Sequence, residues 1–319
     1  MNNPTISTKL NLVVPGKKKD VRATQKADKV LKGFGLTFSY IFLIIAAFII
    51  LLPFYYMIIA SFMTESELSQ GNTFWPTQGE LIENIVFNYT NTLSRFNYWK
   101  YVGNTLIVGL TTTCGGLIIT ILSAFAFARL KFRGRDLLFT CFLATMMIPG
   151  EMMVITNFTT MSNLGLISLK STAVQSYMAM ILPFLASVFY IYLLRQNFKQ
   201  IPNELYLAAK VDGKSDWTYL WKVMVPLSAP TLITIFILSL IGSWNAYVWP
   251  KLVVSNSDYY LISVALRSAS LQIEDHEQLI TQYSWVMAAT VLVTVPLLLL
   301  FIIFRKYIMR GVGRAGIKG

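Results

Sequence analysis

Long runs of apolar residues alternate with shorter polar stretches along most of the 319-residue chain. A helix needs about 20 mainly apolar residues to cross the hydrocarbon core of a bilayer. Six runs have about that length, at residues 36–60, 103–128, 137–159, 173–194, 230–250 and 284–304. The pattern predicts an all-α membrane protein in which residues 35–304 form one domain of six transmembrane helices.

Two of these runs are interrupted by residues that do not favour a continuous helix in lipid. The third contains Pro149, Gly150 and Glu151 in succession, and the fourth begins in the polar stretch SLKSTAVQS. Glu151 is the only acidic residue within a predicted span, and a charged side chain in a membrane commonly serves a function. Two interpretations of Glu151 stay open: it lines a water-filled pathway at a broken helix, or it is paired for structural reasons.

The composition supports a membrane protein, because 55% of the residues are hydrophobic and only 13% are charged. A soluble domain carries about a quarter charged residues. Of the 27 lysines and arginines behind the net charge of +12, all but five lie in the two tails and in two alternate loops. Cytoplasmic loops are enriched in these residues. We therefore expect cytoplasmic tails at 1–34 and 305–319, a cytoplasmic loop at 195–229 and no nucleic-acid partner.

Neither the cysteines nor the histidine suggests a metal site. Cys114 and Cys141 both lie in apolar runs, where we expect them to be buried as small hydrophobic residues. The single histidine is His276, in a polar loop. No metal or other cofactor is predicted for this chain.

The stretch AAKVDGKSDW at 208–217 resembles a phosphate-binding loop, since Gly213-Lys214-Ser215 fills most of G-x-x-x-x-G-K-[ST]. Such a loop follows a buried strand. The preceding residues PNELYLAAKVD are instead helix formers without a β-branched run. The sequence therefore argues against a nucleotide site here.

A helix–turn–helix explains the same stretch better. Pro202 suits the first turn of a helix and Gly213 the position just past its end. Ser215 or Asp216 can cap a second helix. That helix would place four residues on one exposed apolar face, with Pro226 and Pro230 ending it: Trp217, Leu220, Trp221 and Met224. The hairpin either lies on the membrane surface or docks a partner protein.

The run IPNELYLAAKVDGKSDWTYLWKVMVPLSAP resembles the "EAA" loop of ABC importer membrane subunits. Two alanines, an Asp-Gly pair and a Pro-Leu-x-x-Pro group follow its pattern: Ala208, Ala209, Asp212, Gly213, Pro226, Leu227 and Pro230. The sequence departs from the pattern at Leu207, where the family has a glutamate, and at Lys214, where it has an alanine. Glu204 is acidic but lies one turn earlier.

The resemblance extends over most of the chain and is closest to the smaller membrane subunit of maltose-type carbohydrate importers. It includes AFAFARLKFRGRDLLF, MIPGEMMVI, GSWNAYVWPKLVV and the ending GRAGIKG. The resemblance implies the type I permease fold in a bacterial cytoplasmic (inner) membrane. It also implies a coupling loop at 197–230 whose site residues contact a separate ATPase: Glu204, Leu207, Ala208, Ala209, Asp212, Gly213, Trp217 and Pro226.

The resemblance further implies the partners of the chain. These are a second homologous permease, an ATPase dimer that binds ATP and Mg, an external or periplasmic substrate-binding protein and membrane lipid. This chain would have no enzymatic activity of its own. It would form half of a pathway for a sugar or oligosaccharide, although glycerol-phosphate and acidic sugars use similar permeases.

Four residues at the outer end of the fifth predicted span could line that pathway: Trp244, Asn245, Tyr247 and Trp249. Aromatic faces and amides suit sugars, but an interfacial aromatic belt is the competing interpretation. Two other classes of protein are alternatives to an importer subunit. An intramembrane enzyme would need paired catalytic groups, which Glu151 alone does not supply. A stand-alone secondary transporter would not need the coupling loop.

Overall fold

The computed structural model describes residues 21–71, 74–269, 271–275 and 278–313, and these divide into two compact units at residues 1–56 and 57–319. His276, the first twenty residues and most of the GRAGIKG ending lie outside the described residues. The first unit contains helix α1 (Val21–Ala60) up to Tyr56. Its stretch Leu36–Ala60 is long and apolar enough to cross a membrane, and none of its most apolar window is buried inside the chain.

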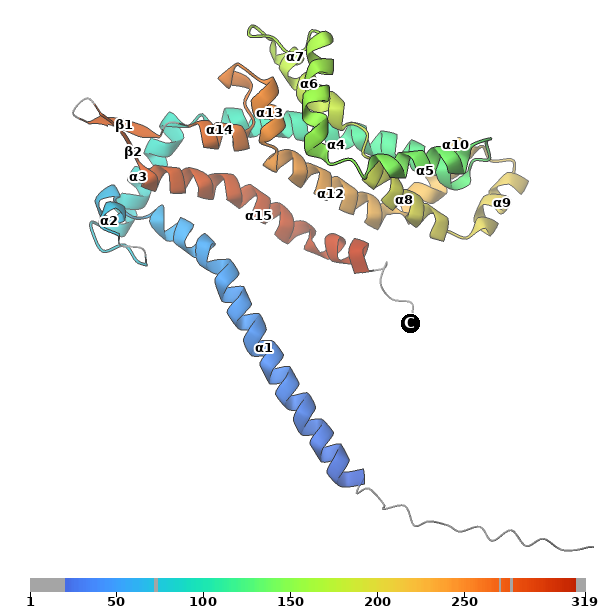
Figure 1. The fold of residues 1–319 in the computed structure, drawn as a ribbon, viewed down its shortest axis with the longest axis horizontal. Coiled ribbons are helices and arrows are strands. Elements are labelled where there is room, and N and C mark those ends of the chain that lie inside the picture. Colours follow the sequence, from blue (N-terminus) through green and yellow to red (C-terminus); the bar gives the residue numbers. More distant parts are fainter. Residues whose placement is uncertain (1–20, 72–73, 270, 276–277, 314–319) are drawn as a thin grey trace, which may run out of the picture. The chain divides into compact units, whose positions relative to one another are not determined.

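The second unit is built around three helices that lie side by side in Figure 1: α4 (Tyr98–Arg129), α12 (Ala229–Asn245) and α15 (Tyr283–Gly313). Helix α8 (Val188–Gln200) packs along α4 on the other side. A buried cluster that joins α4 and α8 to the segment 219–235 includes Phe125, Leu194 and Phe198. The apolar faces predicted from the sequence therefore meet in a helical core.

Helix pairs with a sharp bend replace several of the predicted straight spans. Helix α5 (Arg135–Thr145) and the segment Gly150–Asn163, which comprises η1 (Gly150–Met152) and α6 (Met153–Asn163), meet at 84°. The segment Ala173–Phe184, made of α7 (Ala173–Ile181) and η2 (Leu182–Phe184), meets α8 at 50°. The break predicted at Pro149 and Gly150 is confirmed.

Within the described residues, three helices are long and apolar enough to cross a membrane, and up to six spans result if each bent pair counts as one. The third pair joins Asp216–Leu227 to α12 at 78°. Helix α12 ends at Asn245, earlier than the predicted limit of 250. The backbone of Ala246 is extended, and a separate short helix begins at Val248. The number of six spans and the orientation of the termini stay predictions.

The remaining elements are short and connect these helices. They are α2 (Glu65–Ser69), α3 (Leu81–Arg95), α9 (Asn203–Val211), α10 (Asp216–Tyr219), η3 (Leu220–Met224), α11 (Val225–Leu227), α13 (Val248–Val253), η4 (Ser257–Tyr259), α14 (Ile262–Ser268), β1 (Gln272–Asp275) and β2 (Gln278–Thr281). The two strands pair antiparallel, with Gln272 opposite Thr281. This small hairpin is a departure from the predicted all-α fold.

Two glutamates organise the loop between α1 and α3. The side chain of Glu67 is buried and accepts hydrogen bonds from the backbone N–H groups of Thr64, Thr77 and Gln78. Glu65 accepts from the backbone N–H of Ser284 at 3.1 Å, so it satisfies a donor in the first turn of α15. These contacts fix the loop onto the start of a long apolar helix.

The expectation that both cysteines are buried is wrong. Cys114 and Cys141 are exposed on the surface of the chain. Each belongs to an apolar helix, α4 or α5, but lies on a face that the rest of the chain does not cover. An apolar run specifies a membrane environment, and it does not specify which face of a helix meets protein.

Candidate functional site

The turn at Gly213 ends α9 by a regular helix-capping motif. The backbone N–H of Lys214 donates to the carbonyl of Ala209 at 2.9 Å, and that of Gly213 donates to Lys210 at 3.1 Å. This pair of bonds is the Schellman motif, and it requires a left-handed residue just past the helix. Gly213 has φ +70°, as predicted. The Gly-Lys-Ser triplet is thus a turn between two helices and has no preceding strand.

The second helix of the loop begins at the predicted cap but is less regular than predicted. The side chain of Ser215 accepts from the backbone N–H of Thr218 at 3.2 Å, which confirms the cap. After one turn of α10 the chain forms the π-helical segment η3 and continues as α11. Pro226 lies in the first turn of α11, and the break before α12 comes at Ser228.

The prediction of one exposed apolar face on this second helix is wrong. Leu220 and Met224 are buried in the cluster with α4 and α8, and Trp221 is half-buried, whereas Trp217 is 62% exposed. The helix uses its aliphatic side chains to attach itself to the membrane helices. The exposed apolar surface of the loop therefore comes mainly from α9.

Polar side chains hold α9 and α10 together across the Gly213 turn. The hydroxyl of Tyr206 donates to Oδ1 of Asp216 at 2.7 Å, and Lys210 Nζ lies 2.8 Å from the same oxygen. The hydrogen bond that Lys210 donates to Asp216 holds the pKa of Lys210 above its ordinary value. The rings of Tyr206 and Tyr219 meet edge to face at 5.1 Å. The two helices therefore form one compact unit.

Arg129 adds polar contacts between this unit and the end of α4. Arg129 donates to the carbonyl oxygens of Phe198 at 3.0 Å and Ile201 at 2.5 Å, and to Oδ1 of Asn203 at 3.1 Å. These acceptors lie at the end of α8 and the start of α9. Arg129 therefore connects the end of α4 to the junction between α8 and α9.

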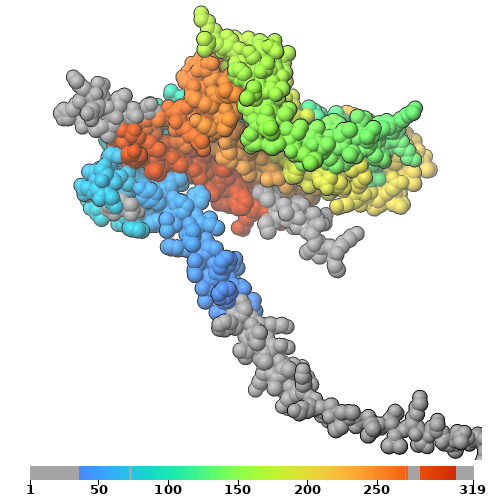
Figure 2. Space-filling model, in the orientation of Figure 1, coloured from blue at the N-terminus to red at the C-terminus, as the bar shows by residue number. Residues whose placement is uncertain are grey.

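One side of α9 faces away from the rest of the chain, and we call it the outer face of α9. Its exposed residues have the spacing i, i+3, i+4, i+7: Glu204, Leu207, Ala208 and Val211. Leu207 is 55% exposed and Val211 is 89% exposed. The yellow-to-tan segment that contains α9 lies at the surface in Figure 2. The outer face is apolar with one carboxylate at its start.

Most of the predicted coupling residues are exposed, although they lie on different elements of the loop. Those that are exposed are Glu204, Leu207, Ala208, Asp212, Gly213, Trp217 and Pro226. Ala209 instead packs against the buried cluster of α4 and α8. Two residues of this region were not predicted: Val211, which the i+7 spacing from Glu204 could have revealed, and Arg129, which carries no local signal.

The predicted pathway residues do not form one cluster. Trp244 is buried and its indole N–H donates to the carbonyl of Val293 at 3.3 Å. Asn245 is exposed, and the ring of Tyr247 lies under the guanidinium of Arg267 at 4.3 Å. Glu151 is exposed in η1, at the bend between α5 and α6. The roles of these residues in a pathway stay predictions.

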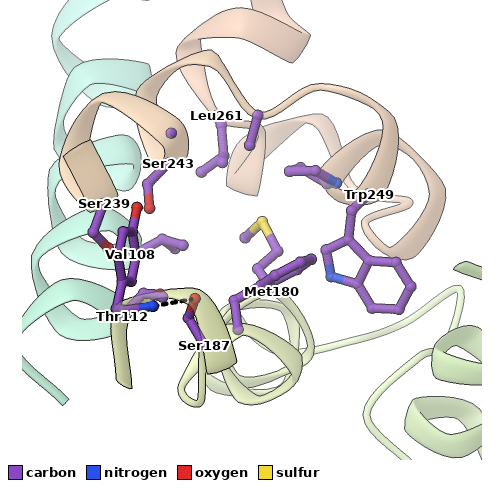
Figure 3. Close-up of a pocket in the computed structure, with 13 residues that line it drawn as sticks. Val108, Thr112, Met180, Ser187, Ser239, Ser243, Trp249 and Leu261 are labelled. Carbon is purple, nitrogen blue, oxygen red and sulfur yellow. Dashed lines mark hydrogen bonds between the residues drawn. The ribbon is translucent and has the colours of Figure 1, made fainter. Parts of the chain in front are cut away.

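Trp249, the last predicted pathway residue, lines a pocket of about 320 Å³ between α4, α7, α8, α12 and α13. Figure 3 shows the pocket, which is lined by Val108, Thr112, Met180, Phe184, Ser187, Tyr190, Ser239, Gly242, Ser243, Ala246, Trp249, Pro250 and Leu261. Most of its polar groups are hydroxyls, and they belong to residues that lie within the predicted apolar spans. No group of acidic, histidine and cysteine side chains suited to a metal occurs in the described ranges.

Known proteins resemble this chain over most of its length. The family described as "Binding-protein-dependent transport system inner membrane component" matches residues 116–314. The arabinooligosaccharides transport system permease protein AraQ of Halalkalibacterium halodurans is 29% identical over 287 residues, which cover 89% of this chain and 96% of that protein. The lactose transport system permease protein LacG of Rhizobium radiobacter is 29% identical over 273 residues, covering 86% and 93%.

Two further comparisons extend the range of relatives. The sn-glycerol-3-phosphate transport system permease protein UgpE of Yersinia pestis is 28% identical over 276 residues, covering 86% of this chain and 94% of that protein. The crystal structure of a bacterial ABC transporter involved in the import of the acidic polysaccharide alginate contains a chain with the same fold. Its TM-score is 0.71 at 24% identity, and the match covers 92% of this chain and 99% of that one.

The matched family region contains the Gly213 turn, the outer face of α9 and α12. It covers more than half of the chain, and the helical architecture agrees with the related solved structure. The protein therefore belongs to the family of binding-protein-dependent transport system inner membrane components.

Proposed function

We propose that this chain is a permease subunit of an ATP-driven importer in the bacterial cytoplasmic membrane, where it forms half of the pathway for a sugar or oligosaccharide. Six spans with both termini in the cytoplasm place residues 197–230 on the cytoplasmic side. The observation that carries the proposal is the outer face of α9, an exposed apolar surface on a helix that is itself firmly held.

The outer face of α9 is the docking surface for a separate ATPase, which binds ATP and Mg. Ala208 allows a partner helix to approach closely, and Leu207 and Val211 supply apolar area to bury. Because Arg129 and Asp216 join α9 to its neighbours, a displacement of α9 moves the ends of α4 and α8 with it. Closure of the ATPase dimer on ATP would thereby change the arrangement of the membrane helices.

The other partners follow from the same scheme. A second homologous permease completes the pathway between the two subunits, and an external binding protein delivers the solute. Relatives named for lactose and arabinooligosaccharides support a carbohydrate as the solute. Membrane lipid covers the remaining apolar surface, which includes exposed residues along α1.

Affinity purification of the full chain from its own membrane, followed by mass spectrometry, tests the proposal. We expect a second permease and an ATPase to co-purify. Val211→Arg should remove the ATPase but keep the second permease, because a charge replaces the most exposed apolar side chain of the docking surface. Leu205→Arg, an exposed residue of α9 outside the outer face, is the matched control. A chain that purifies alone would contradict the proposal and favour a stand-alone secondary transporter.

The pathway residues need a separate test, because no contact in the chain assigns them. Asn245→Ala should lower solute uptake while the ATPase still co-purifies. Unchanged uptake would remove Asn245 from the pathway. The same pair of measurements on Glu151→Gln decides whether the carboxylate at the α5–α6 bend takes part in transport.

A further inference from the structure

The pocket between α4, α8 and α12 contains hydroxyl groups that the protein itself does not use. Thr112 is a buried residue, yet its hydroxyl makes no hydrogen bond within the described part of the chain, and the same holds for the hydroxyls of Tyr190 and Ser243. The hydroxyls of Ser187 and Ser239 have one partner each, the backbone N–H of Tyr190 and the hydroxyl of Thr113. Figure 3 shows Thr112, Ser187, Ser239 and Ser243 around the open space.

These hydroxyls border the pocket, where a ligand that enters it can form hydrogen bonds with them. Each hydroxyl both donates and accepts, which matches a ligand that carries hydroxyls of its own. The remaining lining is apolar and includes the indole of Trp249, whose N–H is already bonded to the carbonyl of Ala179 at 3.1 Å. The indole therefore offers an apolar surface to the pocket and no further donor.

None of the residues that line the pocket is charged. A phosphate or carboxylate taken from water needs a cation or several N–H donors, because a buried, unpaired charge is far more costly than a neutral polar group. The pocket provides no cation. Its volume of about 320 Å³ lies at the lower end of the range for small-molecule sites.

We infer that this pocket holds an uncharged, hydroxyl-rich unit of the transported solute, such as one neutral sugar ring, and that it excludes phosphorylated and acidic solutes. The inference rests on the proposed function, because it takes the ligand of the pocket to be the solute that the importer transports. Thr112, Tyr190 and Ser243 would then bind the solute. The substrate class of this chain would also differ from that of relatives named for glycerol phosphate.

Gly242 gives a direct way to fill the pocket. It lies in α12 on the pocket wall, and a Cβ added there meets no heavy atom within 4 Å. Gly242→Leu should therefore occupy the space intended for the ligand without displacing the helices. Gly103 of α4 has equally free space but does not line the pocket, so Gly103→Leu is the matched control. Thr112→Val keeps the shape of the side chain and removes one free hydroxyl.

The experiment measures uptake of radiolabelled lactose, arabinotriose, sn-glycerol-3-phosphate and galacturonate by native cells, by cells lacking the gene and by complemented cells. We expect deletion to abolish uptake of a neutral sugar only. Wild type and Gly103→Leu should restore it, Gly242→Leu should leave less than a tenth, and Thr112→Val should raise the half-saturating concentration about three- to tenfold. Immunoblots of the membrane fraction check that each variant is inserted.

The outcomes separate this inference from the proposed function. Full uptake by Gly242→Leu, or an unchanged half-saturating concentration in Thr112→Val, would overturn the pocket as a binding site. Uptake of sn-glycerol-3-phosphate or galacturonate that depends on the gene would overturn the exclusion of anions while the permease function stands. If deletion changes the uptake of no solute, the proposed function fails and the inference fails with it.

Discussion

The hydroxyl of Tyr206 donates a 2.7 Å hydrogen bond to Asp216, and this contact joins the two helices on either side of the Gly213 turn. The same carboxylate accepts from Lys210, so α9 is held to α10 by two side chains that lie one turn apart. These contacts connect α9 to the segment that packs on α4 and α8.

Tyr206→Phe removes the hydroxyl and keeps the ring against Tyr219. A hydrogen bond of this kind is worth about 1 kcal/mol, and its loss lets α9 move independently of α10. We expect solute uptake to fall about three- to tenfold while the ATPase still co-purifies with the chain. Tyr192→Phe is the control, since its hydroxyl makes no hydrogen bond within the described ranges. Equal uptake by the two variants would show that the Tyr206–Asp216 bond is not needed for coupling.

We expect glycine to be needed at position 213 because of its left-handed backbone conformation, and not because a side chain would collide with neighbouring atoms. A Cβ at this position meets no heavy atom, but φ of +70° is unfavourable for a side chain by about 1–2 kcal/mol. Gly213→Ala should lower uptake, whereas Gly213→Asn should keep most of it, because asparagine tolerates the left-handed region. Uptake assays on equal amounts of inserted protein compare the two. If asparagine were as harmful as alanine, side-chain bulk at the ATPase contact would be the cause.

The features that the sequence predicted well are local. The Gly213 turn, the Ser215 cap and the break at Pro149 depend on residues within a few positions of each other. Pairing at longer range was not predictable, and Arg129 shows why. Its acceptors lie about 70 positions later in the chain, and nothing in the stretch AFAFARLKF distinguishes Arg129 from the other basic residues of the loop.

The pocket was missed for a related reason. Thr112, Ser187 and Ser243 lie in different apolar runs, and a hydropathy pattern treats each as a tolerated polar residue. Only the packing of α4, α8 and α12 brings them together around one space. The same limit applies to the aromatic group at the end of the fifth predicted span. Trp244 and Trp249 are five positions apart, but the end of α12 between them sends the two indoles to different buried clusters.

Arg129→Lys tests the connection between α4 and the coupling loop. Lysine keeps the charge but lacks the rigid fork that reaches two carbonyls and an amide at once. Hydrogen bonds to a charged group are worth about 1.5–3 kcal/mol, so we expect uptake to fall at least tenfold with the second permease still bound. Arg133→Lys, in the neighbouring loop, is the matched control. Normal uptake by Arg129→Lys would mean that force reaches α4 only through the apolar core.

Glu67→Gln tests the loop that rests on the start of α15. Burial by itself raises the pKa of Glu67, but hydrogen bonds from Thr77, Thr64 and Gln78 outweigh it and hold the pKa below the ordinary value of 4.5. Because the folded pKa is lowered, the stabilisation is fully present above that ordinary value and is lost as the pH falls through the lowered pKa. The loop of the wild type should therefore keep its structure down to mildly acidic pH.

The glutamine variant should lack this stabilisation at every pH, a loss on the order of 2 kcal/mol. Hydrogen exchange of the segment 64–71 measures it: we expect weaker protection than in the wild type at neutral pH, and convergence of the two proteins in strong acid. Glu80→Gln is the control, because the Glu80 side chain is exposed and makes no capping hydrogen bond at the start of α3. Equal protection of Glu67→Gln and Glu80→Gln at neutral pH would show that the buried carboxylate does not hold the loop.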